Sequence, residues 1–332
     1  MIDPHDIPLP ITWSAETPDT TTMLEIIDNQ LYDRCGEHMV ALEAMTGKIA
    51  WTASLGERSG EGLLMRAVGS MVVTDTYTGH GRTTELVGVR AGAVAYRTEV
   101  GVIVGLQGSC VLGDEVFVIG VDPKGGCALR SIRGEDGVRR VDRKLSGRDV
   151  TSARGRLLVL NSFSEPGIVS LDRDGGDDRV VERTPAQEMA VAGDWLLVAA
   201  RTGAGLERTA RLIDLESGAI QWSHPAYGPM IALDDELAVH VESHAGMLVP
   251  VARDRATGEL RWRGSASLGD DAGTFRFAGS LIAFTHGGGT TLYARDDGKF
   301  VAELLLSYAL ATHGRYLYLR NSQDVFCADA SR

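Results

Sequence analysis

A chain of 332 residues with 40 glycines, 44% hydrophobic and only 6% aromatic residues is typical of a soluble, turn-rich protein. Its formal net charge of −12 argues against nucleic acid as a partner, because phosphate binding requires a cationic face. No stretch reaches the roughly 18–20 consecutive apolar residues of a membrane-spanning helix, so we expect no membrane contact.

The N-terminal segment Met1–Asp6 is acidic where a secretory signal would be basic, and no apolar run follows it. We therefore expect a cytoplasmic protein. The scarcity of Lys and Asn beside abundant Ala, Gly and Arg is typical of a GC-rich bacterial genome. The first candidate strand is Leu9–Trp13, which ends in a large aromatic residue.

From residue 28 onward, a tight polar turn followed by an apolar strand recurs along the chain. Gly and Asp supply the positive-φ or side-chain-bonded geometry of a hairpin, and the apolar run after them predicts a buried strand. The eight copies are Asp28–Tyr32, Gly69–Val73, Gly113–Phe117, Arg154–Leu158, Gly193–Leu197, Asp234–Ala238, Gly279–Ala283 and His313–Leu317.

A second pattern alternates with the first and ends in a large residue. Its fullest form is Ala41–Trp51 (ALEAMTGKIAW), and Ala252–Trp262 keeps Ala, Thr-Gly and Trp at the same offsets. Leu212–Trp222 keeps Gly and Trp. Degenerate copies are Gly88–Tyr96, Ser131–Val141, Ser170–Val181 and Tyr293–Val301. The Gly permits the turn that returns the chain antiparallel.

This second pattern resembles the tryptophan-docking motif of PQQ-type β-propellers, which include quinoprotein alcohol dehydrogenases and an outer-membrane assembly propeller. The resemblance extends over nearly the whole chain and implies an all-β fold of four-stranded antiparallel blades. It also implies that each Trp packs between blades, against the small residue at the start of the motif. We therefore expect a single PQQ-like β-propeller domain over residues 1–332.

The number of blades follows from the two patterns. Eight inner turns stand against seven outer strands, near Trp51, Tyr96, Val141, Val181, Trp222, Trp262 and Val301. Their spacing is close to the roughly 40–45 residues of a four-stranded blade. The last repeat lacks an outer strand, so we predict that residues 9–14 complete it and close an eight-bladed ring. Seven blades with a loose N-terminal tail is the alternative.

The resemblance does not extend to quinone chemistry. A quinoprotein site requires an adjacent cysteine pair, a catalytic Asp and Glu and Asn ligands for calcium, whereas Cys35, Cys110, Cys127 and Cys327 are scattered. We expect reduced, buried thiols, no cofactor and no catalytic residue. The spacing His240-x-Glu242-x-His244 could aim three side chains to one face of a strand, but His244-Ala245-Gly246 predicts a turn, so we assign no metal site.

Two other motifs also receive structural interpretations. The cluster Arg139, Arg140, Arg143 and Lys144 predicts a solvated strand edge, and the stretch Gly287–Gly289 predicts a hairpin turn.

What remains for function is a set of loops on a rigid scaffold. The segments 74–84, 119–126, 161–167, 201–209 and 223–229 are expected to be loops on one face. They carry the candidate partner-binding residues Tyr77, His80, Arg82, Phe163 and Tyr227.

The leading hypothesis is a non-catalytic interaction scaffold that binds a protein or peptide partner within a cytoplasmic bacterial multi-protein system. The acidity of the chain favours a partner with a basic surface. The alternatives are a small-molecule or carbohydrate binder or enzyme that uses the channel mouth, and a periplasmic assembly scaffold.

Overall fold

The computed structural model describes residues 9–16, 23–27, 29–35, 37–56, 64–78, 83–103, 108–121, 126–161, 167–201, 207–265, 268, 273–287, 289–305, 308–320 and 324–331. Within these residues lie thirty-two β-strands and no helix. They form two compact units, one of residues 16–183 and one of residues 1–15 with 184–332. The single domain expected from the sequence stays a prediction.

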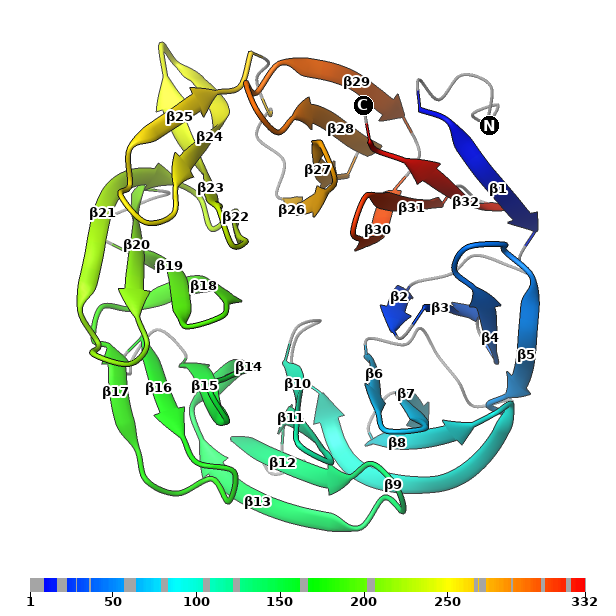
Figure 1. Cartoon of the computed structure of the whole chain (residues 1–332). Helices are drawn as coiled ribbons and strands as arrows, with labels where there is room; N and C mark the ends of the chain where they lie inside the picture. Colours follow the sequence, from blue (N-terminus) through cyan, green and yellow to red (C-terminus); the bar gives the residue numbers. More distant parts are fainter. Residues whose placement is uncertain are drawn as a thin grey trace. The chain divides into compact units, whose positions relative to one another are not determined.

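The unit of residues 16–183 contains four groups of four strands (Figure 1). The first two groups are β2 (Met23–Ile27), β3 (Gln30–Cys35), β4 (His38–Glu43), β5 (Ile49–Ser54), and β6 (Met65–Val68), β7 (Met71–Thr78), β8 (Thr83–Arg90), β9 (Ala93–Ile103). The next two are β10 (Ser109–Leu112), β11 (Glu115–Val121), β12 (Cys127–Arg133), β13 (Arg139–Leu145), and β14 (Gly147–Ala153), β15 (Arg156–Asn161), β16 (Ile168–Leu171), β17 (Arg179–Glu182).

The other unit also contains four such groups. Three of them are β18 (Ala186–Ala192), β19 (Trp195–Arg201), β20 (Glu207–Asp214), β21 (Ile220–Tyr227); β22 (Ile231–Leu233), β23 (Leu237–His244), β24 (Met247–Asp254), β25 (Leu260–Arg263); and β26 (Gly273–Ala278), β27 (Leu281–His286), β28 (Gly289–Ala294), β29 (Phe300–Leu305). The fourth is β30 (Tyr308–His313), β31 (Tyr316–Arg320), β32 (Asp324–Asp329) with β1 (Ile11–Glu16).

The N-terminal strand completes the last group, as predicted. The strand order is β1-β32-β31-β30, so the first strand of the chain pairs with the last one. Thr12 Oγ1 donates to Cys327 O at 3.0 Å, and the backbone N–H of Asp329 donates to Pro10 O at 3.0 Å. The strand ends at Glu16, two residues beyond the predicted segment. Without β1, the outer edge of β32 would be unpaired, which is a route to edge-to-edge association.

The second strand of each group is buried, and within each unit neighbouring groups pack face to face. In β11 and β19 almost every residue is buried, and both sequences are nearly continuous apolar runs. The outer strands are instead largely exposed, as in β25, where Trp262 is the one buried residue. The core therefore lies between blades; one apolar cluster joins Trp262 of β25 to Phe284 and Tyr293 of the next blade.

The hairpin glycines have a second role that the sequence did not reveal. A Cβ atom at Gly298 would lie 2.3 Å from Cε3 of Trp262, and one at Gly258 would lie 2.7 Å from Cγ of Trp222. Each indole ring thus packs on the turn glycine of the following blade. Trp262 Nε1 also donates to Arg295 O at 2.5 Å. The glycine both turns the chain and leaves space for the ring.

A β-bulge turns each of these tryptophans toward its neighbour. Ala252 pairs with Trp262 and Arg253 with Leu260, so one extra residue separates the two pairs on β25. The same shift precedes Trp51 and Trp222. A bulge locally increases the twist of its strand, which re-aims the side chain that follows. The sequence pattern repeats because this geometry repeats.

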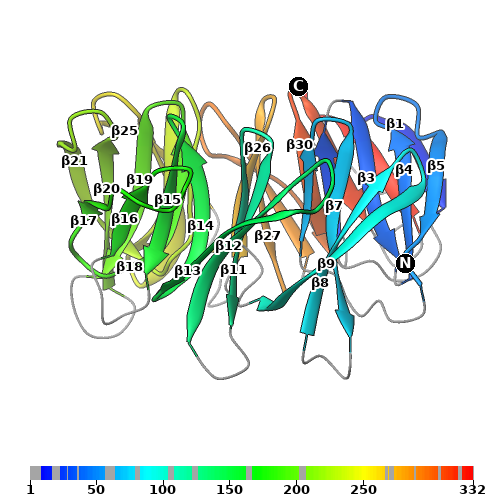
Figure 2. The same ribbon diagram turned by 90° about the horizontal axis from the view of Figure 1, so that it is seen from below.

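Two neighbouring blades are hydrogen-bonded into one sheet, which the sequence did not predict. Strand β9 is 11 residues long, and its last residues Val102 and Ile103 pair with Val121 and Gly120 of β11. Figure 1 shows β9 extending past its own blade to reach β11. In the same unit, β7 and β8 form a long hairpin that is paired as far as Thr78 and Thr83 (Figure 2).

Two of the three cysteines whose side chains are described are buried, as expected from the sequence. Cys110 and Cys327 are buried free thiols, whereas Cys127 is only partly buried. Burial is the main reason that the pKa of Cys110 is raised to about 12. It is therefore an unreactive thiol at neutral pH.

Candidate functional site

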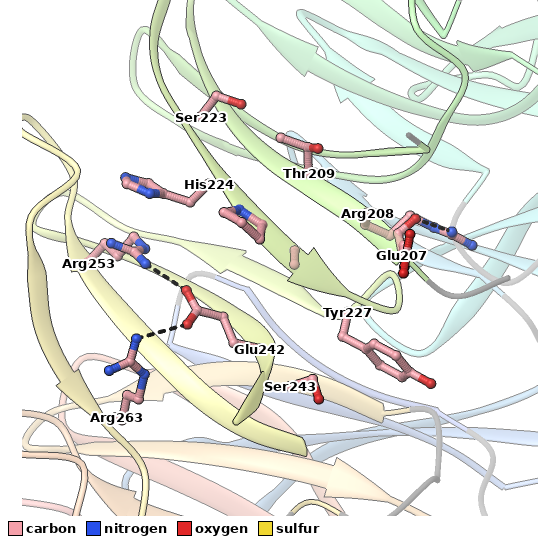
Figure 3. A pocket seen from close by; sticks show the side chains of 12 residues that line it. Glu207, Arg208, Thr209, Ser223, His224, Tyr227, Glu242, Ser243, Arg253 and Arg263 are labelled. Atoms are coloured by element: carbon pink, nitrogen blue, oxygen red, sulfur yellow. Dashed lines mark hydrogen bonds and ion pairs between the residues drawn. The ribbon is translucent and has the colours of Figure 1, made fainter. Parts of the chain in front are cut away.

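A groove lies between the outer parts of two neighbouring blades in the unit of residues 1–15 and 184–332. Its volume is about 900 Å³, and β20, β21, β23, β24 and β25 supply its walls. The lining residues are Glu207, Arg208, Thr209, Ser223, His224, Pro225, Ala226, Tyr227, Glu242, Ser243, Arg253 and Arg263 (Figure 3). A concave site of this size is within the range that holds drug-sized ligands.

Strand pairing explains why these residues meet. The turn Ala245-Gly246 has positive φ at both residues, 51° and 79°, which matches the twist of a two-residue hairpin. It keeps β23 and β24 paired as far as His244 and Met247, so Glu242 remains on a regular strand. Strands β24 and β25 then bring Arg253 and Arg263 to the same side chain.

Glu242 lies at the centre of a charged network. Its Oε1 accepts from Arg253 Nη2 at 2.6 Å, and its Oε2 accepts from Arg263 Nη2 at 3.2 Å. Burial alone would raise the pKa of Glu242, but the hydrogen bond from Arg253 and the nearby positive charges outweigh burial and lower it. The carboxylate is therefore ionised at neutral pH and offsets part of the charge of two guanidinium groups.

His240 lies beneath this network and is uncharged. The side chain is fully buried, and desolvation is the main cause that lowers its pKa to about 4. Arg253 Nε donates to His240 Nε2 at 3.1 Å, which requires that Nε2 carry no proton. Although His240 Nε2 lies 3.7 Å from Glu242 Oε1, the two do not form an ion pair at neutral pH. His240 instead orients the guanidinium of Arg253.

Two further basic side chains face the groove. Burial, together with repulsion from Arg253, lowers the pKa of His224, so this imidazole is neutral at neutral pH. Its ring lies 5.4 Å from the ring of Trp222 between centroids. Arg208 is buried; its Nε donates to Gln187 Oε1 at 2.6 Å and its Nη1 donates to Glu207 O at 2.7 Å. The lining thus contains three arginines against two glutamates.

Of the residues predicted to bind a partner, one lines the groove. Tyr227 is half-buried there, but it is the last residue of β21 and not part of a loop. Tyr77 likewise lies in a strand, β7, and its side chain is not among the described ones. His80, Arg82 and Phe163 lie outside the described residues.

The loop predicted for residues 223–229 is wrong for its first five residues, which belong to β21. Pro225 and Gly228 suggested an early end to the strand. Proline is tolerated here because β21 is the outer strand of its sheet, where a missing N–H leaves no ladder bond unmade. The longer strand positions His224 and Tyr227 along the groove.

Glu242, Arg253 and Arg263 were not singled out as a binding cluster by the sequence. The only signal was the alternation His240-x-Glu242, which placed both side chains on one face of a strand. In the structure Glu242 on this face accepts hydrogen bonds from Arg253 and Arg263. No group of three His, Cys, Asp or Glu side chains that could hold a metal occurs among the described residues.

Two of the four basic residues predicted at the edge on β13 form ion pairs within their own unit. Arg143 Nη2 contacts Asp178 Oδ2 at 2.5 Å, and Arg139 Nη1 lies 3.9 Å from Asp142 Oδ2. Of the predicted turn Gly287–Gly289, Gly288 lies outside the described residues, and His286 of β27 pairs with Gly289 of β28. No helix in the described part of the chain has the length and apolar character needed to cross a membrane.

The comparisons with known proteins concern the fold. No family model matches the chain, and no curated protein matches it in sequence. Among solved structures, BamB from Moraxella catarrhalis is 16% identical, with a TM-score of 0.69 and 97% of each chain covered. The Dos1 propeller is 9% identical, with a TM-score of 0.67 over 97% of this chain and 95% of that one.

The chain is an eight-bladed β-propeller. It is all-β, its blades are four-stranded and antiparallel, and the seven-bladed alternative is wrong.

A quinohemoprotein alcohol dehydrogenase from Pseudomonas putida HK5 is also similar in structure. It has a TM-score of 0.61 at 11% identity, and the match covers 97% of this chain and 76% of that one. At these identities the likeness extends to the fold alone.

Proposed function

We propose that this propeller is a non-catalytic protein-interaction scaffold of the PQQ-like repeat type, and that a partner protein docks at the groove beside β21. The observation that supports this most is the groove itself, where polar side chains converge on walls built by rigid strands. Recognition residues on a rigid scaffold lose little conformational entropy on binding. A role within a bacterial multi-protein system is part of this proposal, and the cytoplasmic location stays a prediction.

The acidity of the chain adds an electrostatic contribution. With a net charge of −12, the surface should steer a partner whose own surface is basic, and association should weaken as salt screens the attraction. This long-range effect acts on the encounter and does not depend on which side chain enters the groove.

The test is capture of a partner from the native host with the tagged chain and two matched variants. Tyr227→Ala removes a half-buried aromatic side chain from the groove, whereas Phe300→Ala removes an aromatic side chain that is 47% exposed on β29 outside it. We expect one partner to be retained by the wild type and Phe300→Ala and lost with Tyr227→Ala. Equal retention by both variants would refute docking at this groove.

A second candidate function, binding of a small molecule, is favoured by the same groove. Its volume of about 900 Å³, its convergent hydroxyl groups and the lowered pKa of His224 meet the criteria for a ligand pocket. Titration calorimetry with mono- and oligosaccharides and with small organic acids tests it. Absence of heat at millimolar concentrations of all these compounds would argue against this candidate.

A further inference from the structure

The two arginines at Glu242 differ in what they still offer a ligand. Arg253 uses its Nε for His240, its Nη1 for Gly258 O and its Nη2 for Glu242. Arg263 contacts Glu242 through Nη2 only, and its side chain is 39% exposed. Among the described residues its Nε and Nη1 have no hydrogen-bond partner. All three nitrogens of the Arg253 guanidinium therefore donate within the network, whereas Arg263 has N–H groups at the groove that a ligand can accept from.

The charge of the groove selects the kind of ligand. Its three arginines and two glutamates, with His224 neutral, leave one net positive charge on a chain of net charge −12. A single carboxylate matches this charge and the planar donors of a guanidinium. A phosphate with its roughly two negative charges would exceed it, and Glu242 would repel it.

The rest of the groove is larger than a carboxylate needs. Thr209, Ser223 and Ser243 add hydroxyl groups, and Tyr227 adds an aromatic ring beside them. A volume of about 900 Å³ is near the upper end for drug-sized ligands, so it can hold several residues of an extended chain. The outer edge of β21 pairs with no other strand of its sheet and lies along the same wall.

We infer that the groove binds an acidic peptide segment of the partner, with Arg263 holding an Asp or Glu carboxylate and Glu242 acting as an internal competitor for the guanidinium. This inference rests on the proposed function, since it names the part of the partner that docks. It makes opposite predictions for two neighbouring residues. Removing the charge of Arg263 should weaken binding, and removing the charge of Glu242 should strengthen it. A purely structural role of the network would weaken binding in both variants.

The experiment uses an array of octapeptides in which every sequence occurs in an acid form and in an amide form, with Asp and Glu replaced by Asn and Gln. Binders are measured again in solution by fluorescence polarisation against the wild type, Arg263→Gln, Glu242→Gln and Arg261→Gln. The last variant is the matched control, because Arg261 lies on the same strand, is exposed and contacts Asp254 outside the groove. Thermal unfolding of each variant checks that it folds.

We expect the amide forms to bind about tenfold more weakly or worse than the acid forms, as for loss of a charged hydrogen bond. Arg263→Gln should lose about tenfold, Arg261→Gln less than twofold, and Glu242→Gln should gain severalfold. If Glu242→Gln does not fold, the difference in peptide affinity between Arg263→Gln and Arg261→Gln still tests the inference.

Three results would overturn the inference: equal binding of acid and amide forms, equal losses in Arg263→Gln and Arg261→Gln, or no octapeptide binding below millimolar concentration. Competition by free N-acetylglutamate with the affinity of the best peptide would also overturn it, in favour of a small carboxylic acid. Partner capture reports on the proposed function separately. If Tyr227→Ala loses the partner while the acid and amide peptides bind equally, the groove remains the docking site. Only the proposed preference for an acidic segment is then refuted.

Discussion

The contact between a turn glycine and the tryptophan of the preceding blade predicts a specific cost of adding one methyl group. Gly298 has φ +66°, and a Cβ there would lie 2.3 Å from Cε3 and 2.7 Å from Cδ2 of Trp262. Real Cβ atoms do not approach other atoms so closely, so the Gly298→Ala variant must displace the indole or the turn. Both are constrained, because Trp262 is buried and its Nε1 donates to Arg295 O.

Two contributions to the loss can be separated. An alanine at positive φ costs about 1 kcal/mol from backbone strain, and overpacking of a filled contact costs about 1–3 kcal/mol more. Gly314 isolates the first contribution, since its φ is +56° and a Cβ there would meet nothing within 4 Å. We therefore expect Gly314→Ala to cost about 1 kcal/mol and Gly298→Ala about 3 kcal/mol in the free energy of unfolding.

The assay is urea unfolding followed by tryptophan fluorescence and by circular dichroism, which together test for a two-state transition. The double variant Gly298→Ala with Trp262→Ala completes the test, because the added methyl group no longer clashes once the ring is removed. The free energy lost in the double variant should then be smaller than the sum of the two single losses by more than about 1 kcal/mol. Equal destabilisation by Gly298→Ala and Gly314→Ala would refute the packing role of the glycine.

Three further predictions follow from other parts of the chain. Because the pKa of His240 is lowered to about 4 from 6.5, its contribution to stability is fully present above pH 6.5 and should be lost as pH falls toward 4, by about 3 kcal/mol. Urea midpoints from pH 7 to pH 4 should thus fall more steeply in the wild type than in His240→Gln, and parallel slopes would contradict the buried neutral imidazole. Asp75 forms a fully buried pair with Arg34 at 3.4 Å, so Asp75→Ala should cost about 3–5 kcal/mol, whereas Asp178→Ala, which removes the half-exposed partner of a partly exposed Arg143, should cost less than about 1 kcal/mol in the same assay. Deleting residues 1–16 removes β1 and exposes the edge of β32, so size-exclusion chromatography should detect oligomers or aggregates; a stable monomer of the truncated chain would argue against closure by β1.

Much of the fold follows from short-range patterns. Each polar turn before an apolar run is a β-hairpin in the structure, from Asn29 with φ 64° to Gly314 with φ 56°. Seven of the eight turns place a residue at positive φ, and in the eighth Asp234 Oδ1 accepts from the backbone N–H groups of Glu236 and Leu237. The apolar runs depend on burial of both strand faces. Both causes act within a few residues and are visible in the sequence. The surplus strand near Trp13 was visible in the same way, as an unmatched outer strand.

The candidate site depends on causes that a sequence does not display. Glu242, Arg253 and Arg263 meet because strand register and the bulge after Ala252 align three different strands. Register is a property of pairing between strands, and no local propensity specifies it. Tyr227 was selected from the sequence for its chemistry, but its position on a strand and not in a loop followed only from the tolerance of an outer strand for Pro225.

The amino-acid sequence by itself determined the turns, the strand count, the four-stranded repeat and the use of an N-terminal strand to complete the last blade. Tertiary structure alone decided which blades share hydrogen bonds through β9, why a side chain at Gly298 would clash with Trp262, and where the arginines gather around Glu242. The physical reason is the distance along the chain over which each interaction acts. Turn chemistry and alternation act between neighbours in the chain, whereas packing, register and desolvation act between segments that only the folded protein brings together.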